Sequence, residues 1–173
     1  NRYLWRMNPR RMESEVVRDS LLALGGQLDR TMGGPILDEK QGLSLPRRSV
    51  YFKLTTEHRM LFMDLFDLAS SNECYERRES VIPQQALALS NSVLALNQSR
   101  LLARSLSAPA STDVAFITAA FEQVLGRLPT AEEAARCERF LRDQRDLLRT
   151  PGKLTSFPAV GAASIAPSPD GAA

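Results

Sequence analysis

The sequence has few of the residues on which most enzymes and metal proteins depend. Its 173 residues include one histidine, His58, and two cysteines, Cys74 and Cys137. The cysteine spacing matches no zinc or haem-attachment pattern, and no carboxylate pair, Ser/His/Asp set or metal-spaced His/Cys group stands out. We therefore predict no catalytic, cofactor-binding or metal-binding residue in this chain.

A long apolar run is also missing. The longest apolar segments fall far short of the ~20 residues that a transmembrane helix needs, so we predict no membrane span. The chain does not begin with Met, and no charged-then-apolar leader is present. We expect a piece of a longer chain, with any targeting signal upstream. Its composition, 43% hydrophobic and 24% charged, fits one globular domain that folds without metal or disulfide.

Lysine is scarce, and the charges are unevenly placed along the chain. The net charge is +2, but residues 1–11 hold four arginines and no acid, with Tyr3 and Trp5 between them, while residues 61–79 hold five acids and two arginines. A basic arm with interleaved aromatic rings is typical of single-stranded nucleic-acid binding. Because acids follow the arm at once, nucleic-acid binding ranks third among our functional hypotheses.

Periodic apolar residues predict a mainly α-helical fold. We expect an amphipathic helix that starts at Asn8 and Pro9 and ends near Gly25, followed by an extended loop. A long central helix is expected from about Pro83 to Pro109, buried on much of its surface. Its apolar stripe consists of Leu87, Leu94 and Leu101, widened by Leu89, Val93 and Leu96.

Between the first and the central helix, two segments have their own patterns. Residues 49–55 alternate apolar and polar side chains, which predicts one short strand whose pairing partner stays open. Residues 60–68 are densely apolar and are predicted to form a short helical turn or an extended segment that crosses the core.

The C-terminal part carries the clearest helix signals. Thr112 or Ser111 can cap a helix that ends at Gly126, and Thr130 with Glu133 forms a capping box for the next helix. We predict a C-terminal helical hairpin. Residues 150–173 are mostly Pro, Gly, Ala and Ser, so the domain should span 1–149 and a flexible tail or linker should follow.

The stretch "CYERRESVIPQQALALSN", from Cys74 to Asn91, looks more like chemistry than any other. A nucleophilic cysteine needs a base or a positive environment, but the acids around Cys74 offset Arg77 and its neighbour, and His58 could act only if the fold brought it near. We therefore interpret the stretch as a loop-to-helix junction with a packed thiol. A disulfide between Cys74 and Cys137 is left open.

Four motifs, in this order, carry a resemblance to a known family: "LWRMNPRRMESEVVRDSLLALGGQLDRTMGGP", "RRSVYF", "CYERRESVIPQQALALSN" and "VLGRLPTAEE". The sequence over residues 1–148 resembles the C-terminal planctomycete-specific domain of unknown function. That resemblance implies an extracytoplasmic, periplasmic or cell-surface, multidomain protein of planctomycetes or related bacteria. The resemblance also implies that haem c is carried elsewhere in the full-length protein, and this chain itself has no C-x-x-C-H motif.

The resemblance implies no catalytic residue. We expect most of the charged residues in the matching motifs to have structural roles. We expect the arginines near the first helix to form ion pairs with its acids and anchor the loop. The arginines are Arg10, Arg11, Arg18 and Arg30, and the acids are Glu13, Glu15, Asp19 and Asp29. A possible functional surface would consist of Arg47, Arg48, Arg77, Asp67 and Cys74.

The leading hypothesis is a non-catalytic structural or interaction module at the C-terminus of an extracytoplasmic, cytochrome-c-associated protein. Its partners would be the upstream domains of the same chain or other extracytoplasmic proteins. The rival is part of an enzyme, polysaccharide-related or redox, whose site is shared with missing upstream domains. A single deep pocket holding Arg48, Arg77 and Asp67 would favour the rival, and a flat face with satisfied ion pairs would favour the module.

Overall fold

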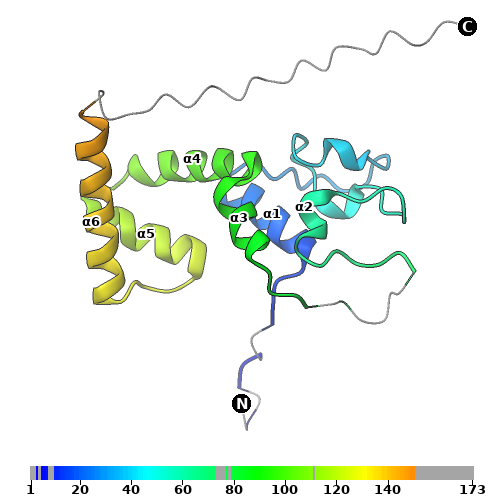
Figure 1. The fold of residues 1–173 in the computed structure, drawn as a ribbon, viewed down its shortest axis with the longest axis horizontal. Coiled ribbons are helices and arrows are strands. Elements are labelled where there is room, and N and C mark those ends of the chain that lie inside the picture. The colour runs from blue at the N-terminus through cyan, green and yellow to red at the C-terminus, as the bar shows by residue number, and fades with distance from the viewer. Residues whose placement is uncertain are drawn as a thin grey trace, which may run out of the picture. The chain divides into compact units, whose positions relative to one another are not determined.

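The computed structural model describes residues 3, 5–7, 10–72, 77, 79–110 and 112–150. The chain divides into two compact units, Asn1–Leu128 and Pro129–Ala173. The helices of the first unit are α1 (Ser14–Leu24), α2 (Leu61–Asp64), α3 (Pro83–Asn91), α4 (Val93–Ser107) and α5 (Asp113–Leu125), and α6 (Ala131–Leu148) belongs to the second (Figure 1). The prediction of a mainly helical fold is confirmed.

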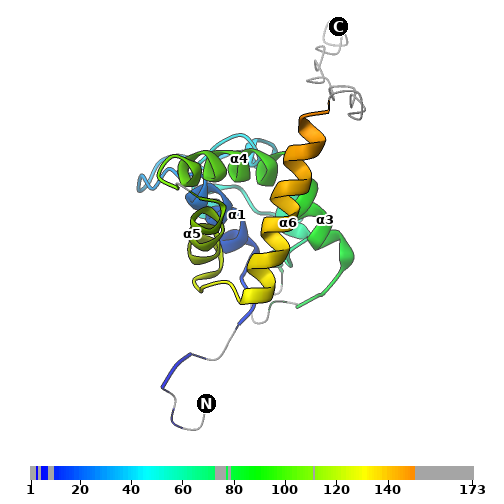
Figure 2. The same cartoon turned by 90° about the vertical axis from the view of Figure 1, so that its left-hand side faces the viewer.

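The core of the first unit is built around α1 and the segment that contains α2. α1 contacts α2 and α4 (Figures 1 and 2). The buried side chains are Leu22, Phe52, Met60, Phe62, Met63, Phe66, Leu68 and Leu94. Most of them come from residues 60–68, so the prediction that this dense apolar segment crosses the core is confirmed.

A glycine allows α4 to approach the end of α1 closely. A Cβ atom on Gly25 would collide with the Gln98 side chain and would lie 3.2 Å from the Gln98 Cα. Gln98 is itself buried on α4. The predicted end of the first helix near Gly25 is confirmed, and the same glycine provides the space in which Gln98 packs.

The predicted start of the first helix is wrong. Residues 10–13 are not helical, and α1 begins at Ser14 with Glu13 in an extended conformation before it. Asn8 and Pro9 lie outside the described residues. Tertiary contacts hold this segment: Arg11 forms an ion pair of 2.9 Å with Asp67 and donates to the Ser80 carbonyl, both far along the chain.

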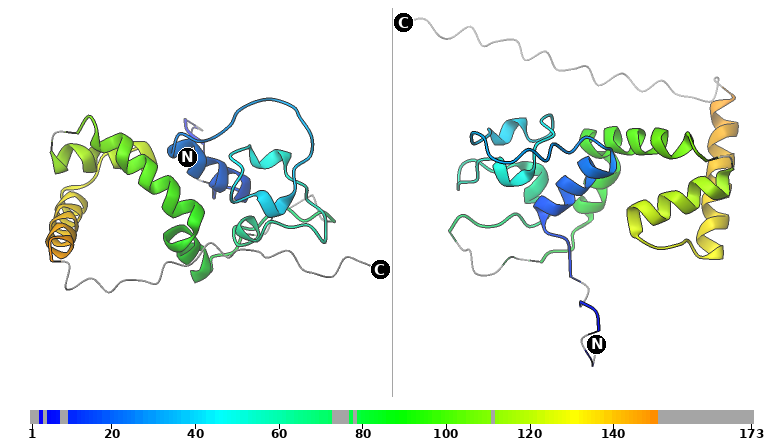
Figure 3. Two further views of the ribbon diagram at one scale, coloured as in Figure 1. Left: turned by 90° about the horizontal axis from the view of Figure 1, so that it is seen from above. Right: turned by 180° about the vertical axis from the view of Figure 1, so that it is seen from behind.

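The loop between α1 and α2 forms an arc that returns to α1 (Figure 3). It contains two 3₁₀ turns, η1 (Glu39–Gln41) and η2 (Ser49–Tyr51), and two isolated parallel bridges, Asp29 with Arg47 and Leu37 with Phe52. The strand predicted over 49–55 is therefore wrong. Asp19 of α1 binds the Ser49 backbone N–H and hydroxyl, which folds the chain into a turn. Within residues 49–55, a β-type contact is kept at Phe52, which forms the bridge with Leu37.

The single central helix predicted from Pro83 is also wrong, because it is broken at Ser92. Ser92 has an extended backbone (φ −66°, ψ 144°), and its hydroxyl oxygen accepts a hydrogen bond from the Ala95 N–H at 3.2 Å, capping α4. Serine competes for backbone groups in this way and favours helix starts over helix interiors. α3 buries none of its residues.

The apolar stripe predicted for the central helix is buried only in part. Leu94 is 3% exposed, whereas Leu87, Leu89, Val93 and Leu96 are exposed. The cause lies in the break at Ser92, since α3 and α4 no longer present one continuous face to the core.

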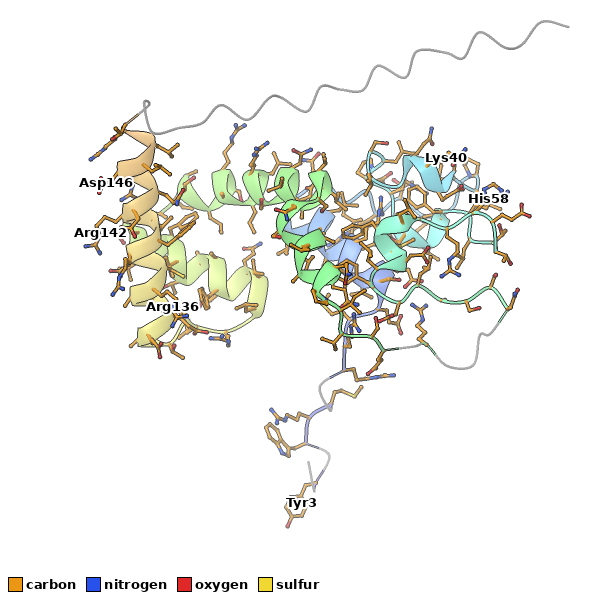
Figure 4. All side chains as sticks on the ribbon, viewed as in Figure 1. Tyr3, Lys40, His58, Arg136, Arg142 and Asp146 are labelled. Carbon is orange, nitrogen blue, oxygen red and sulfur yellow. The ribbon has the colours of Figure 1, made fainter. Side chains whose placement is uncertain are left out.

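The predicted caps of the last two helices are confirmed. Thr112 caps α5, Gly126 follows it with a left-handed backbone (φ 65°), and Thr130 and Glu133 form the capping box of α6. Arg136, Arg142 and Asp146 lie along α6 (Figure 4). α6 belongs to the second unit, so the hairpin stays a prediction, and the tail after residue 150 lies outside the described residues.

Candidate functional site

The site begins with a buried cation at the centre of α1. Arg18 is fully buried, and its guanidinium donates hydrogen bonds to three loop carbonyls, those of Gly42 at 2.7 Å, Leu45 at 2.6 Å and Arg47 at 2.8 Å. It also stacks on the Phe52 ring, 4.7 Å from the ring centroid. Burial lowers the pKa of Arg18, and the neighbouring Asp19 partly offsets this. Arg18 therefore ties the loop to α1.

Asp19, the next residue, fixes the second contact between helix and loop. Its carboxylate accepts from the Ser49 backbone N–H at 2.9 Å and from the Ser49 hydroxyl at 2.6 Å. Asp19 also lies 3.3 Å from the Arg18 guanidinium. The predicted use of Arg18 and Asp19 to anchor the first helix against the loop agrees with these contacts.

Beyond Asp19, two segments of the loop, one containing Asp29 and the other Arg47, run side by side, and we call them the arms of the loop. Asp29 forms a parallel bridge with Arg47, its N–H donates to the Pro46 carbonyl at 2.9 Å, and the Asp29 carboxylate lies 3.2 Å from the Arg47 guanidinium. Hydrogen bonds from the Thr31 hydroxyl and N–H lower the pKa of Asp29, and Arg47 adds to the effect. Arg47 is thus committed to the loop itself, where it also stacks on Tyr51.

Between α1 and these loop arms lies an open depression of about 440 Å³, which we call the α1–η2 depression. Its lining residues are Glu15, Val16, Asp19, Ser20, Ala23, Leu28, Arg30, Arg48 and Val50. It falls within the usual size range of ligand pockets, about 300–1,000 Å³. Of the four described members of the predicted functional surface, only Arg48 lines it.

Glu15 at the edge of the depression pairs with Arg77. Two hydrogen bonds, of 2.6 and 3.2 Å, join the guanidinium of Arg77 to the two carboxylate oxygens. Burial raises the pKa of Glu15, but the hydrogen bonds from Arg77 and Ser14 outweigh it and the net pKa is lowered. Arg77 does not line the depression, and its role is to neutralise Glu15.

Asp67 belongs to a separate cluster. It accepts hydrogen bonds from the Ser80 N–H at 2.8 Å and from the Ser80 hydroxyl at 2.7 Å, and it lies 2.9 Å from Arg11. Burial by itself raises the pKa of Asp67. The hydrogen bonds from Ser80 and the charge of Arg11 outweigh this effect, so the net pKa lies below its ordinary value. Gln85 donates to the Leu65 and Ser80 carbonyls and completes the cluster, which ties α2 to the start of α3.

The residues singled out in the sequence therefore do not converge. Arg48 lines the α1–η2 depression, Arg77 pairs with Glu15, Arg47 pairs with Asp29, and Asp67 binds Ser80. Cys74 lies outside the described residues. Arg30 was expected to form an ion pair, but it is exposed and has no hydrogen-bond or ion-pair partner among the residues that the structure describes.

His58 makes a contact that sequence reasoning missed. Its Nδ1 lies 2.9 Å from the carboxylate of Glu39, which is almost fully buried, and this hydrogen bond lowers the pKa of Glu39. His58 and Lys40 lie in the loop region of the first unit (Figure 4). The two partners are 19 residues apart in a segment without periodicity, so no pattern in the sequence could pair them.

The described part of the chain offers neither a metal-binding cluster nor a membrane-spanning helix. Within it, no group of three or more His, Cys, Asp or Glu side chains is arranged to hold a metal ion. None of the helices in the same residues has both the length and the apolar content to cross a bilayer.

The comparisons with known proteins now add a family. A family model described as "PSD1: Protein of unknown function (DUF1553)" matches residues 1–141. The chain belongs to this family. The PSD1 match covers all of the first unit and reaches Leu141 in α6. No curated protein and no solved structure matches the chain.

Membership of the PSD1 family confirms the coarser expectation from the sequence motifs, a domain of unknown function. The family description assigns no reaction and no ligand, so no residue inherits a role from it. Any function must be argued from the contacts described above.

Proposed function

We propose that this chain is a non-catalytic structural or interaction module at the C-terminus of an extracytoplasmic, cytochrome-c-associated protein of planctomycetes or related bacteria. The observation that supports the non-catalytic part most directly is the use of its charged side chains. Arg18, Arg47 and Arg77 each bind the protein's own loop carbonyls or carboxylates. Guanidinium groups committed in this way hold a scaffold together and are not available to bind the negative charge of a substrate.

Exposed apolar side chains support the interaction part. Leu87 and Leu89 of α3 and Val93 and Leu96 of α4 are between 39% and 67% exposed, and they lie close together along the chain on either side of Ser92. Contiguous exposed apolar surface is commonly buried in a larger assembly. We propose that the upstream domains of the same chain cover this surface in the full-length protein.

The location and the haem are tested by the coding DNA on both sides of this segment. A secretion signal and a C-x-x-C-H motif upstream would support an exported haem protein, and haem staining of the purified full-length product would verify attachment. An open reading frame without either would contradict both the location and the cytochrome association.

The interaction role is tested by hydrogen exchange. We expect the amides of α3 and of the first turns of α4 to exchange more slowly in the full-length product than in this 173-residue chain. Amides of α1, which the module buries by itself, serve as the internal reference. Equal exchange of α3 in both proteins would contradict a role for this surface in contacts between domains.

A deep pocket holding Arg48, Arg77 and Asp67 together would favour the enzyme alternative. Of these three, only Arg48 lines the α1–η2 depression. The described residues therefore give no support to a shared active site at this depression.

A further inference from the structure

The α1–η2 depression has an uncompensated positive charge. Of its charged lining residues, Glu15 is neutralised by Arg77, and Asp19 is engaged by Arg18 and by the N–H and hydroxyl of Ser49. Arg30 and Arg48 are both exposed and have no hydrogen-bond or ion-pair partner among the described residues. The depression therefore offers two free guanidinium groups to a ligand.

The register of the loop places these two arginines side by side. Asp29 and Arg47 face each other in a parallel bridge, and their side chains form an ion pair. Side chains alternate along extended backbone, so the next residue on each arm, Arg30 and Arg48, points to the opposite side from that pair. Both therefore face the depression, in agreement with its lining.

Apart from Ser20, the uncharged lining residues are apolar. Val16 of α1 is 45% exposed and Val50 of η2 is 69% exposed, and Ala23 and Leu28 complete the apolar part. A ligand that fills the depression thus needs apolar groups next to its negative charge. Among the described residues, no aromatic side chain lines the depression, so this part of the chain offers no stacking platform for bases there.

The walls of the depression are held in place before any ligand arrives. The hydrogen bonds from Ser49 to Asp19 fix η2 against α1, and Arg18 binds the carbonyl of Arg47, the residue before Arg48. Preorganised surfaces lose less conformational entropy on binding than mobile ones. The arginines and Val50 therefore stand on a fixed backbone.

We propose that the α1–η2 depression binds an extended protein segment in which acidic and apolar side chains alternate. Carboxylates of the segment pair with Arg30 and Arg48, and its apolar side chains pack on Val16 and Val50. The proposal rests on the proposed function as an interaction module, and it names the chemistry of the segment that a partner protein presents to this depression.

The test measures fluorescence anisotropy with an acetylated and amidated peptide of alternating glutamate and leucine that carries a neutral dye. The 173-residue chain should bind this peptide saturably, and added salt should weaken the binding. Arg30→Gln and Arg48→Gln should each raise the Kd about 1.5- to 5-fold, the range for exposed ion pairs. Val50→Ser should also raise it.

Matched controls separate this site from general charge and hydrophobicity. Arg100→Gln changes an exposed arginine on α4, and Val114→Ser changes a valine on α5 that is 53% exposed, and neither lines the depression. Both variants should bind the peptide as the unchanged chain does. A peptide with glutamine in place of glutamate tests whether the carboxylates are needed.

Several results would overturn the proposal. They are an absence of saturable binding, equal losses in the Arg48→Gln and Arg100→Gln variants, and equal affinity for the glutamine peptide. A single-stranded oligonucleotide that binds through Arg30 and Arg48 while the peptide does not would assign the surface to nucleic acid instead. If the peptide does not bind but the amides of α3 exchange more slowly in the full-length protein, this proposal is wrong and the proposed interaction module is still supported.

Discussion

At the scale of single residues, Arg18 is the most consequential side chain of this protein. A fully buried guanidinium is costly unless every donor group finds a partner. Here the loop supplies three carbonyls and the Ser49 hydroxyl, and Asp19 supplies a carboxylate. Because arginine presents five N–H donors in a rigid fork, no other residue can replace all of these bonds at once.

We therefore predict that Arg18→Lys lowers the free energy of unfolding by about 3 kcal/mol or more, because a lysine leaves buried carbonyl groups without donors. Urea denaturation followed by circular dichroism measures the change. The control is Arg100→Lys on the exposed side of α4, which should stay within about 0.5 kcal/mol of the unchanged chain. Similar midpoints for the two variants would show that the hydrogen bonds of Arg18 do not stabilise the fold.

At the scale of elements, the break between α3 and α4 decides which apolar surface stays exposed. Ser92 leaves the helical conformation, caps α4 and turns α3 onto a different course. An uninterrupted helix would present Leu87 and Leu94 on one face, whereas here only Leu94 enters the core. The exposed apolar surface near the junction is thus a consequence of one cap.

The cap itself is testable with a matched pair of serines. Ser92→Ala removes the hydroxyl that accepts from the Ala95 N–H and should destabilise the protein by about 1 kcal/mol, the usual cost of losing an N-cap. Ser90→Ala, two residues earlier on α3, removes only a bond to the Leu87 carbonyl inside the helix and should be nearly neutral. An equal effect of both substitutions, in urea denaturation, would argue against a capping role for Ser92.

At the scale of the whole molecule, carboxylates with lowered pKa values join segments that are distant in the sequence. Glu15 binds Arg77, Asp29 binds Arg47, Glu39 binds His58, and Asp67 binds Arg11 and Ser80. The pKa values of all four carboxyl groups lie below their ordinary values of 4.5 for Glu and 3.8 for Asp. Stability should therefore depend on pH in the acid range.

The sign of that dependence follows from proton linkage. As the pH falls past the ordinary values, the unfolded chain takes up protons before the folded chain does, so the free energy of unfolding decreases. We predict a urea midpoint that is steady from neutral pH to about pH 5, falls below about pH 4.5, and keeps falling through the lowered pKa values. Asp67→Asn should make the fall shallower. A midpoint unchanged at pH 3 would contradict the stabilising role of these contacts.

Local signals in the sequence determined the helical class and several boundaries. The end of α1 near Gly25, the caps at Thr112 and Thr130, the turn at Gly126 and the core role of residues 60–68 all follow from propensity, capping chemistry or apolar density within a few residues. The motifs also pointed to a domain of unknown function, which the family match confirms.

Only the tertiary structure decided the rest, because the deciding partners are distant in the sequence. Asp19 lies 30 residues from Ser49 and turns a strand-like pattern into a 3₁₀ turn. The bridge between Asp29 and Arg47 aligns Arg30 with Arg48 at one depression, although the sequence predicted an ion pair for Arg30 and placed only Arg48 on a functional surface. Local patterns report the conformational preference of a segment, whereas contacts across a loop decide which preference is satisfied and which charges are left free.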